Sequence, residues 1–388
     1  TRVTESAGRR ADGVAIRARS TKPEPGETVE QLDPRDLQNS VPGGPGRVRL
    51  RYADNVNFFN PVESEWFTVD AADDYTHHFK LSGLKPSTVY YVETETSNAD
   101  GSVIHKPVNG RFETAPPENE YATVTFTVIT GQANRDHDHP EGYKMYPAML
   151  KLAPKFIVPT GDTVYYDSDA PLVTSIDLAR FHWQRMYSFP TILNFHLSVP
   201  GYWEKDDHDY RYNDCDNTVD NEPDPSPALG AATFLEQVPV VDPADPNPLT
   251  YRTHRVSRDL QIWLSEGRDY RSPNMAEPGP DKTLWGAEQI AWLKETLLES
   301  DATFKILISP TPMIGPDDAN QAGRQAEGHD PFKRDNHSNP YGFQYERDTF
   351  FDWLEEHDFL DKQFYIVTGD RHWQYHSIHP RGFEEFSS

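Results

Sequence analysis

Along the first third of the chain, short segments alternate hydrophobic and polar residues, as strands do when only one face is buried. The predicted strands lie at 47–52, 66–69, 78–81, 89–92 and 110–114. Asn98-Ala99-Asp100-Gly101 is typical of a hairpin turn, and residues 20–46 are rich in Pro, Gly and Glu, as loops are. The pattern predicts an all-β domain over residues 1–118.

From Thr123 onward, apolar segments of strand length alternate with segments that repeat every three to four residues. We expect strands at 123–129, 156–160, 256–264, 304–310 and 365–368, and helices at 146–152, 177–188, 284–298 and 345–357. Strands that alternate with helices are typical of α/β folds, so residues 119–388 are predicted to form an α/β domain. Two polar segments, 217–249 and 315–341, are expected to be long loops, the first a lid over the active face.

Within the β-rich region, one segment has a more specific pattern. Leu84, Pro86, Thr88 and Tyr90 resemble the tyrosine corner of fibronectin type III-like sandwiches. The region contains no cluster of catalytic residue types. We therefore expect a structural β-sandwich in front of the α/β domain.

Acidic residues concentrate in residues 202–214, where four aspartates, one histidine and one asparagine fall between Asp206 and Asp214. Such a cluster by itself is typical of a solvated loop. Like charges this close repel, however, and a cation would reverse that cost, since carboxylate and amide oxygens are ligands for hard metals. Two apolar strands also end in Gly-Asp, at Asp162 and Asp370. Because open α/β sheets bind ligands at the carboxyl ends of strands, the three clusters are predicted to meet there.

Charge and composition exclude several classes of protein. The 388 residues have a formal net charge of −25, so no basic surface is available for nucleic acid or anionic lipid. No apolar run of about 18 residues exists to span a membrane. Cys215 is the single cysteine, which excludes an intramolecular disulfide. A single phosphorylated small molecule, such as a phosphate ester, could still bind where metal ions supply the positive charge, and the oligomeric state stays open.

Six residues of these clusters have donor atoms suited to metal ions: Asp162, Tyr165, Asp207, Asn213, Asp370 and His372. Asp162 can bridge two metals, a Tyr165 phenolate suits trivalent iron, and oxygen donors suit calcium, magnesium or manganese. Two metals about 4 Å apart can activate water and hold a phosphoryl group. His208 is then expected to contact a phosphoryl oxygen or protonate the leaving alkoxide, and Arg371 to contact the phosphate.

The same motifs resemble the PhoD-type alkaline phosphatases and phosphodiesterases of the calcineurin-like metallophosphoesterases. The matching segments are 161–165, 206–209, 213–214 and 369–373, with lesser matches at 267–271 and 284–289. The resemblance implies a four-layer α/β/β/α sandwich behind an N-terminal β-sandwich. It also implies iron together with calcium, hydrolysis of phosphomonoesters and phosphodiesters, and export by the twin-arginine route, hence a secreted or periplasmic protein.

By position, the resemblance makes Asp162 the bridging ligand, Tyr165 the phenolate and His208 the acid that contacts phosphate. Asp207, Asn213, Asp370 and His372 match the remaining ligands.

One position departs from the family. Its first strand ends in a cysteine that ligates iron, whereas this chain has Gly131, which has no ligand atom. Gln132 or a residue of 136–139 is a possible replacement, although that loop also fits simple solvation. The iron site is therefore expected to be weakened or to take a divalent ion such as manganese, magnesium or zinc. Cys215 does not match the family's ligand and is expected to be structural.

Two further possibilities stay open. A related ester, such as a sulfate or a phospholipid head group, is an alternative substrate, and a binding scaffold without turnover is an alternative of another class. The chain begins at Thr1 without Met, so either a leader has been removed or a longer protein precedes it. We also expect further residues beyond Ser388, because the last motif lies close to that end.

Overall fold

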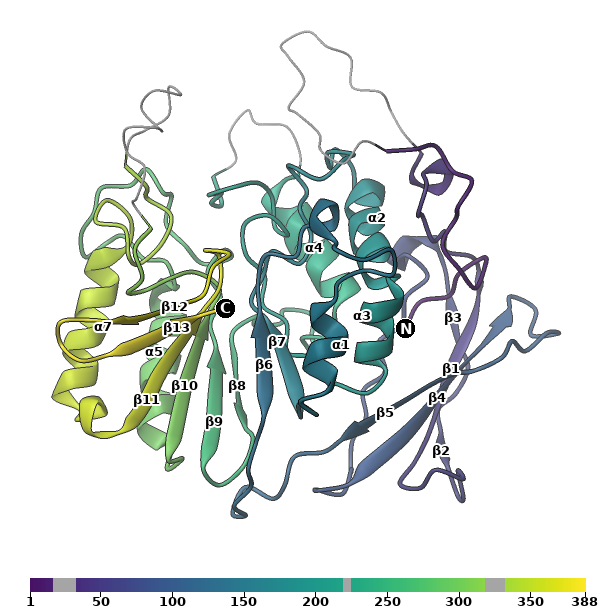
Figure 1. Cartoon of the computed structure of the whole chain (residues 1–388), viewed down its shortest axis with the longest axis horizontal. Coiled ribbons are helices and arrows are strands. Elements are labelled where there is room, and N and C mark those ends of the chain that lie inside the picture. Colours follow the sequence, from purple (N-terminus) through teal and green to yellow (C-terminus); the bar gives the residue numbers. More distant parts are fainter. Residues whose placement is uncertain (17–32, 219–224, 318–331) are drawn as a thin grey trace, which may run out of the picture.

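The structure is a computed structural model and describes residues 1–16, 33–218, 225–317 and 332–388. It contains an antiparallel sheet near the N-terminus, followed by a larger region in which helices flank two sheets (Figure 1). Short 3₁₀ helices occur at Pro34–Asp36, Ala71–Asp73, Asn134–Asp136 and Phe359–Asp361. None of the helices in the described ranges is both long and apolar enough to cross a bilayer.

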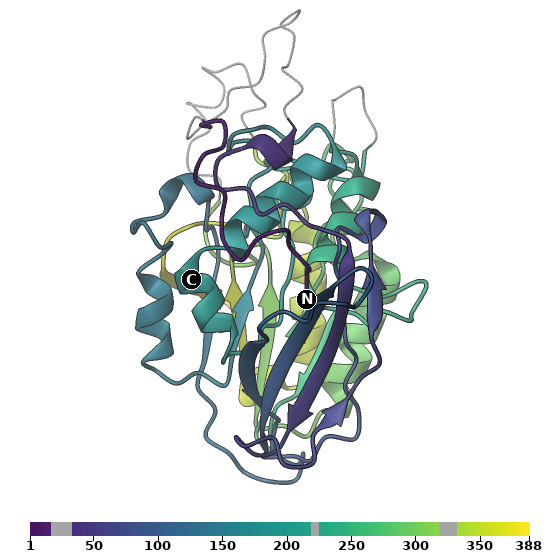
Figure 2. The ribbon, with the colours of Figure 1, turned by 90° about the vertical axis from the view of Figure 1, so that its right-hand side faces the viewer.

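The N-terminal sheet has five antiparallel strands and faces the viewer in Figure 2. Its order is β2-β1-β4-β5, with β3 also paired to β1. The strands are β1 (Gly46–Ala53), β2 (Val62–Glu63), β3 (Phe67–Val69), β4 (Val89–Asn98) and β5 (Val108–Glu113). The expected tyrosine corner is present as a contact, because the Lys85 N–H donates to the Tyr90 hydroxyl oxygen at 2.9 Å.

The strand predicted at 78–81 does not form. Phe79 instead contacts Phe67 and His77 edge-on, with ring centroids 5.8 and 4.6 Å apart. The apolar residues of this segment therefore serve side-chain packing without pairing in a sheet. Much of the loop expected at 20–46 lies outside the described residues.

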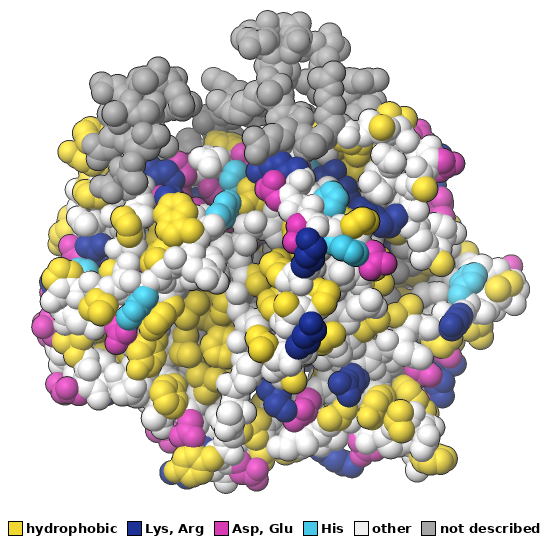
Figure 3. Space-filling model, viewed as in Figure 1, with side chains coloured by type: hydrophobic (Ala, Val, Ile, Leu, Met, Phe, Trp, Pro, Cys, Tyr) yellow, Lys and Arg dark blue, Asp and Glu magenta, His cyan; other side chains and the backbone are white. Residues whose placement is uncertain are grey.

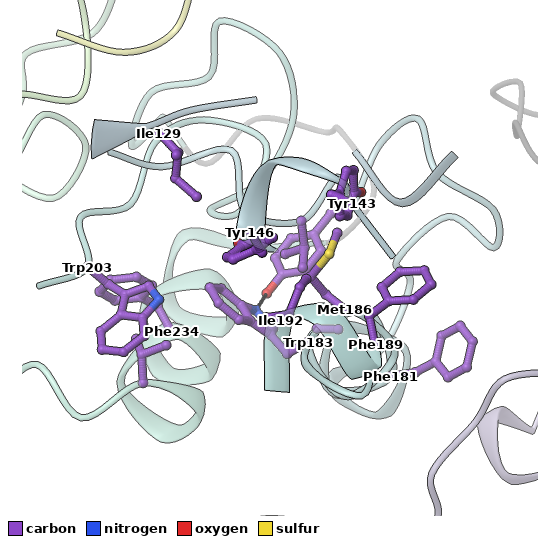
Figure 4. Close-up of a cluster of buried hydrophobic side chains, with 14 of the residues drawn as sticks. Ile129, Tyr143, Tyr146, Phe181, Trp183, Met186, Phe189, Ile192, Trp203 and Phe234 are labelled. Carbon is purple, nitrogen blue, oxygen red and sulfur yellow. Dashed lines mark hydrogen bonds between the residues drawn. The ribbon is translucent and has the colours of Figure 1, made fainter. Parts of the chain in front are cut away.

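The first sheet of the larger region is the parallel pair β6 (Phe126–Ile129) and β7 (Phe156–Pro159). Isolated bridges to Gly201 and Glu204 extend it by one more segment. Four helices accompany it: α1 (Met145–Leu150), α2 (Ile176–Tyr187), α3 (Pro190–His196) and α4 (Pro227–Gln237). Aromatic residues of these helices pack with Ile129 and Ile157 in one buried cluster (Figure 4).

The second sheet has six strands in the order β12-β13-β11-β10-β9-β8. They are β8 (Arg252–Arg255), β9 (Leu260–Leu264), β10 (Phe304–Ser309), β11 (Gln363–Thr368), β12 (Tyr375–Ile378) and β13 (Glu384–Ser387). Strands β9, β10, β11 and β13 run parallel, and both edge strands are antiparallel. Helices α5 (Gly286–Glu299) and α7 (Gln344–Glu356) flank this sheet (Figure 1).

Alternate residues of the central strands join different cores. On β9, Trp263 packs with the residues of α5 and α7, whereas Ile262 and Leu264 pack with Phe156 and Val158 of β7. The two sheets therefore share one apolar core. This alternation is what a strand buried on both faces requires.

Two further expectations need correction, and two loops lie partly outside the described residues. The strand predicted at 256–264 begins only at Leu260, because the Ser257 hydroxyl accepts the N–H groups of Asp259 and Leu260 and turns the chain between β8 and β9. Helix α4 lies inside the segment expected to be a lid, and its Phe234 is buried against Trp183. Residues 219–224 of that segment, and 318–331 of the loop at 315–341, lie outside the described residues.

We predict that His196 makes stability depend on pH. Burial lowers its pKa from 6.5 to about 4, and its ring stacks on Trp203. Between about pH 6.5 and 4, His196 binds a proton in the unfolded chain but stays neutral in the folded protein. Protonation therefore favours unfolding, and the stability contributed by neutral His196 is lost as the pH falls through that window.

In His196→Phe, the unfolding free energy should fall less between pH 6.5 and 4 than in the wild type, by roughly 1–3 kcal/mol. Urea titrations at three pH values measure this. His376→Phe, on the exposed edge strand β12, serves as control. Equal pH dependence in wild type and His196→Phe would contradict the prediction.

Candidate metal centre

Three tight turns bring the predicted clusters to one place at the carboxyl ends of β7, β11 and the segment 201–204. Asp162 and Asp370 have φ of +54° and +67°, a left-handed conformation that is costly for residues with a side chain. At the first turn only glycine fits at position 161, since a Cβ there would lie 2.4 Å from Asp206 Cβ. The backbones of two acidic segments thus touch at this turn.

Asp162, Tyr165 and His372 form a closed triangle. Asp162 Oδ2 lies 3.1 Å from the Tyr165 hydroxyl and 3.0 Å from His372 Nε2. The Tyr165 hydroxyl lies 2.9 Å from the same His372 nitrogen. Residues separated by more than 200 positions therefore present one carboxylate, one phenol and one imidazole to a common point.

Asp207 and His208 approach the same carboxylate from another side. Ligand atoms of Asp162, Asp207 and His208 all lie within 4.8 Å of one another. Among the described residues, the buried Asp162 Oδ1 and Asp370 Oδ2 accept no hydrogen bond. Buried carboxylate oxygens without donors are costly, and a cation removes that cost. The residues present therefore fit a metal centre.

The pKa values of the carboxylates also indicate that the cluster lacks positive charge. Burial raises the pKa of Asp207 to about 6, and burial together with Asp206 raises the pKa of Asp370 well above its usual value. For Asp162, burial is outweighed by His208 and His372, and its pKa falls to about 2. Cationic neighbours outweigh burial for Asp162, but they do not do so for Asp207 and Asp370.

His208 is held by a second carboxylate. Its Nδ1 lies 2.7 Å from Asp167 Oδ1, and its ring lies against Tyr165 with centroids 4.3 Å apart. Burial opposes a charge on His208, but three neighbouring carboxylates raise its pKa well above the usual value. The Asn213 N–H donates to Asp167 Oδ2 at 2.9 Å and fixes that carboxylate.

Two predicted residues are placed differently from the others. Asn213 is exposed. The carboxylate of the neighbouring Asp214 lies within 4.8 Å of carboxylate oxygens of Asp207 and Asp335. The Arg371 guanidinium pairs with Asp317 and lies over the Trp373 ring at 4.3 Å. The predicted roles of Asn213 and Arg371 therefore remain predictions.

Gly131 lies directly beside the cluster. A Cβ at this position would be 2.4 Å from His372 Cδ2, so the imidazole fills the space that a side chain would need. Gln132 and His137 are among the residues considered as replacements for the missing cysteine ligand. The Gln132 side-chain oxygen accepts a hydrogen bond from the Tyr146 hydroxyl, and His137 Nδ1 contacts the Asn134 carbonyl oxygen. Cys215 is buried, and its thiol donates to the Asp207 carbonyl oxygen at 3.6 Å.

A network that sequence reasoning missed supports the cluster. The Arg268 guanidinium is buried and donates to Asp206 Oδ1 at 2.7 Å and to both oxygens of Asp335 at 2.8 and 2.9 Å. Arg268 lay in a lesser family match, which was the one available signal, whereas Asp335 lay in a polar loop with no readable pattern.

A single carboxylate also joins two of the acidic turns. Asp209 accepts the Asp206 N–H at 2.7 Å and the Thr163 N–H at 3.2 Å. Burial raises its pKa to about 8. On the face shown in Figure 3, hydrophobic side chains gather over the second sheet, while charged side chains lie in the upper, lower and outer parts of the same face.

A cluster of carboxylates, imidazoles and a phenol at the strand ends of an α/β fold suits metal-dependent hydrolysis, the chemistry of the metallophosphoesterases. Residues 126–388 match the family model for PhoD-like phosphatase. The chain therefore belongs to the PhoD-like phosphatase family.

Solved structures agree with this fold. The chain is similar to PhoD, with a TM-score of 0.72 and 18% identity over 90% of this chain and 71% of the other. It is also similar to purple acid phosphatase PPD1 from yellow lupin (Lupinus luteus) seeds, with a TM-score of 0.57 and 12% identity over 90% of this chain and 61% of the other. No curated protein matches the chain.

We predict that Gly131→Ala lowers kcat for phosphate ester hydrolysis by roughly 10–100-fold, because the new methyl group displaces His372. Steady-state kinetics and metal content measure the effect. Gly83→Ala is the matched control, since Gly83 has φ of +68° but open space around its Cβ position. It carries the same backbone strain without touching the centre. Equal kcat values for the two variants would contradict the prediction.

Proposed function

We propose that the chain hydrolyses phosphate monoesters and diesters at a metal centre built around Asp162. One observation carries the proposal. The buried Asp162 carboxylate meets a phenol, two imidazoles and a second carboxylate, and its Oδ1 accepts no hydrogen bond from the described residues. Family membership supports the same reaction class.

Asp162, Tyr165 and His372 would hold one metal ion, and Asp162 with Asp207, Asp370 and Asn213 would hold the other. When bound, the ions supply Lewis acidity toward phosphoryl oxygens and lower the pKa of water. Calcium fits the oxygen donors, and iron fits the phenol. Gly131 offers no thiolate to the position that iron would take. The proposal therefore includes manganese, magnesium or zinc as the ion at that position.

His208 supplies the proton for the departing group. Its Nδ1 faces Asp167, which leaves Nε2 as the nitrogen that can donate. As a water oxygen bonds to phosphorus, the ester P–O bond breaks and the Nε2 proton passes to the leaving oxygen. The proton released by the water passes to solvent. The products are an alcohol and a phosphate that carries one ester bond fewer. Arg371 is proposed to contact the phosphate when Asp317 releases it.

Two structural interpretations accompany the proposal. The separate cores on either side of the two sheets support an α/β/β/α sandwich over residues 119–388. The corner at Tyr90 supports a fibronectin type III-like domain over 1–118, of which the described strands form one sheet.

The net charge of −25 supports a secreted or periplasmic location, which fractionation of the native host would test.

Hydrolysis of p-nitrophenyl phosphate and bis-p-nitrophenyl phosphate, each with and without EDTA, tests the function. We expect turnover of at least one ester, loss of turnover in EDTA and recovery on adding back divalent metal. p-Nitrophenyl sulfate is the comparison that tests the alternative ester class. If neither phosphate ester is turned over in a chelator-sensitive way, the proposal is refuted and a binding scaffold is favoured.

We predict that His208→Gln lowers kcat by roughly 10²–10⁴-fold, because proton donation to the leaving oxygen is lost. The loss should be larger for ethyl phosphate than for p-nitrophenyl phosphate, since nitrophenolate leaves without a proton. Metal content should stay at the wild-type value. His376→Gln is the control for removal of a distant histidine. Equal losses on both esters, or loss of metal, would show that His208 has another role.

A further inference from the structure

Arg135 brings a guanidinium group to the metal centre from the loop that follows β6. It belongs to the 3₁₀ helix Asn134–Asp136, and its side chain is only 15% exposed. The guanidinium carbon lies over the aromatic ring of Tyr165, 5.0 Å from the ring centroid. Tyr165 is buried, and a cation over the face of an aromatic ring is attracted to it. Arg135 therefore contacts the residue that supplies the phenol of the centre.

A buried carboxylate fixes this guanidinium group. Arg135 Nη1 donates to Asp169 Oδ1 and to the Ser168 hydroxyl oxygen, both at 3.0 Å. The Asp169 carboxylate also accepts the backbone N–H groups of Asn134 and Arg135 at 2.7 and 3.3 Å. One carboxylate thus holds both the backbone and the side chain of Arg135, so the guanidinium has little freedom to turn away from the Tyr165 ring.

Asp169 is also joined to Tyr165 through the backbone. Its N–H donates to the Tyr165 carbonyl oxygen at 3.3 Å in the turn after β7. The contacts form a closed loop that runs from the Tyr165 backbone to Asp169, then to the Arg135 guanidinium, and back to the Tyr165 ring. Tyr165 is therefore held both at its backbone and at the face of its ring.

The orientation of the ring decides where the phenol oxygen lies. The Tyr165 hydroxyl is 3.1 Å from Asp162 Oδ2 and 2.9 Å from His372 Nε2. Because the hydroxyl is at the far end of the side chain, a small rotation of the ring would move it away from both groups. Ligand atoms need to be placed to within about 0.5 Å, and Gly131 supplies no ligand atom that could take over.

We propose that Arg135 is a positioning residue that holds the Tyr165 ring so that the phenol oxygen faces the metal centre. This inference rests on the proposed function, since it requires Tyr165 to bind a metal ion there. Arg135 acts through Tyr165 and contacts neither the phosphate nor the leaving group.

A double-mutant cycle tests whether Arg135 acts through Tyr165. The wild type, Arg135→Gln, Tyr165→Phe and the double variant are dialysed against a series of EDTA concentrations, and the remaining metal is measured by elemental mass spectrometry. We expect Arg135→Gln to lower the EDTA concentration that removes half of the metal by about 10–100-fold. In the Tyr165→Phe background the same change should have less than about a twofold effect, because the phenol oxygen is already absent.

Two outcomes of this cycle would overturn the proposal. One is an equal loss of metal from Arg135→Gln in both backgrounds, which would show that Arg135 acts independently of Tyr165. The other is a Tyr165→Phe variant that retains metal as the wild type does. Arg135→Lys keeps the charge without the forked geometry and should show a smaller loss of the same kind. It replaces Arg135→Gln in the cycle if urea titration shows that Arg135→Gln does not unfold cooperatively.

Steady-state kinetics with p-nitrophenyl phosphate separate positioning of a ligand from contact with the substrate. Arg135→Gln should lower kcat by about 10–100-fold and leave KM within about threefold of the wild type. A raised KM with unchanged kcat and unchanged metal retention would show that Arg135 binds the substrate, and would overturn the proposal.

Arg49→Gln is the matched control. The Arg49 guanidinium likewise pairs with carboxylates, those of Glu63 and Glu95. It lies 4.9 Å from the centroid of the Trp66 ring, but on β1 of the N-terminal sheet. This variant should keep the wild-type metal retention and kcat.

Failure of this inference can be told apart from failure of the proposed function. A wild type that holds metal and hydrolyses p-nitrophenyl phosphate, together with an Arg135→Gln variant that behaves identically, would overturn the role of Arg135 and leave the proposed function standing. A wild type without bound metal and without chelator-sensitive turnover would overturn both.

Discussion

The fold of the larger region depends on compensating buried negative charge. Asp162, Asp206 and Asp207 are all at most 2% exposed, and their backbones are in contact through the turn at Gly161. Burying several carboxylates together is unfavourable unless cations accompany them. The two histidines outweigh burial for Asp162, whereas Arg268 pairs with Asp206 without offsetting its burial, and the pKa values of Asp206 and Asp207 stay raised. The remaining deficit is what makes this edge of the sheets a place for metal ions.

The neutralising groups come from distant parts of the chain, which ties function to tertiary structure. Arg268 follows β9, Asp335 precedes α7, and Lys205 is fully buried between Glu266 and Asp269 at 2.8 and 2.7 Å. Each pair holds an acidic turn against a strand end. Removing one partner of such a pair leaves an uncompensated charge, which typically costs about 3–5 kcal/mol. The positions of the metal-facing oxygens are therefore set by the same contacts that stabilise the domain.

Much of this arrangement could be predicted from the sequence, because it follows from strand ends. Both Gly-Asp turns lie where an apolar run stops, and the triangle of Asp162, Tyr165 and His372 was expected from that pattern. The helices with a 3.6-residue repeat, such as α2, α5 and α7, were likewise predictable. Periodicity could not show that Phe234 belongs to a buried helix, since Pro-rich flanks obscure α4.

Other features depend on contacts between segments without local pattern. Asp335 lies in a polar loop, and its role is visible only once Arg268 is seen to donate to it. The ion pair of Arg371 with Asp317 and the grouping of Asp214 with Asp207 and Asp335 follow from loop conformation. Likewise, Gly131 is explained only by the position of the His372 ring.

Metal content tests the central claim most directly. The wild type and Asp162→Ala, both purified without added metal and analysed by elemental mass spectrometry, are compared alongside Asp177→Ala, a change at an exposed aspartate at the start of α2. The account predicts bound metal in the wild type and in Asp177→Ala, and loss of metal in Asp162→Ala while cooperative unfolding is retained. A wild type that turns over phosphate esters without metal, or an Asp162→Ala variant that keeps the full metal content, would contradict it.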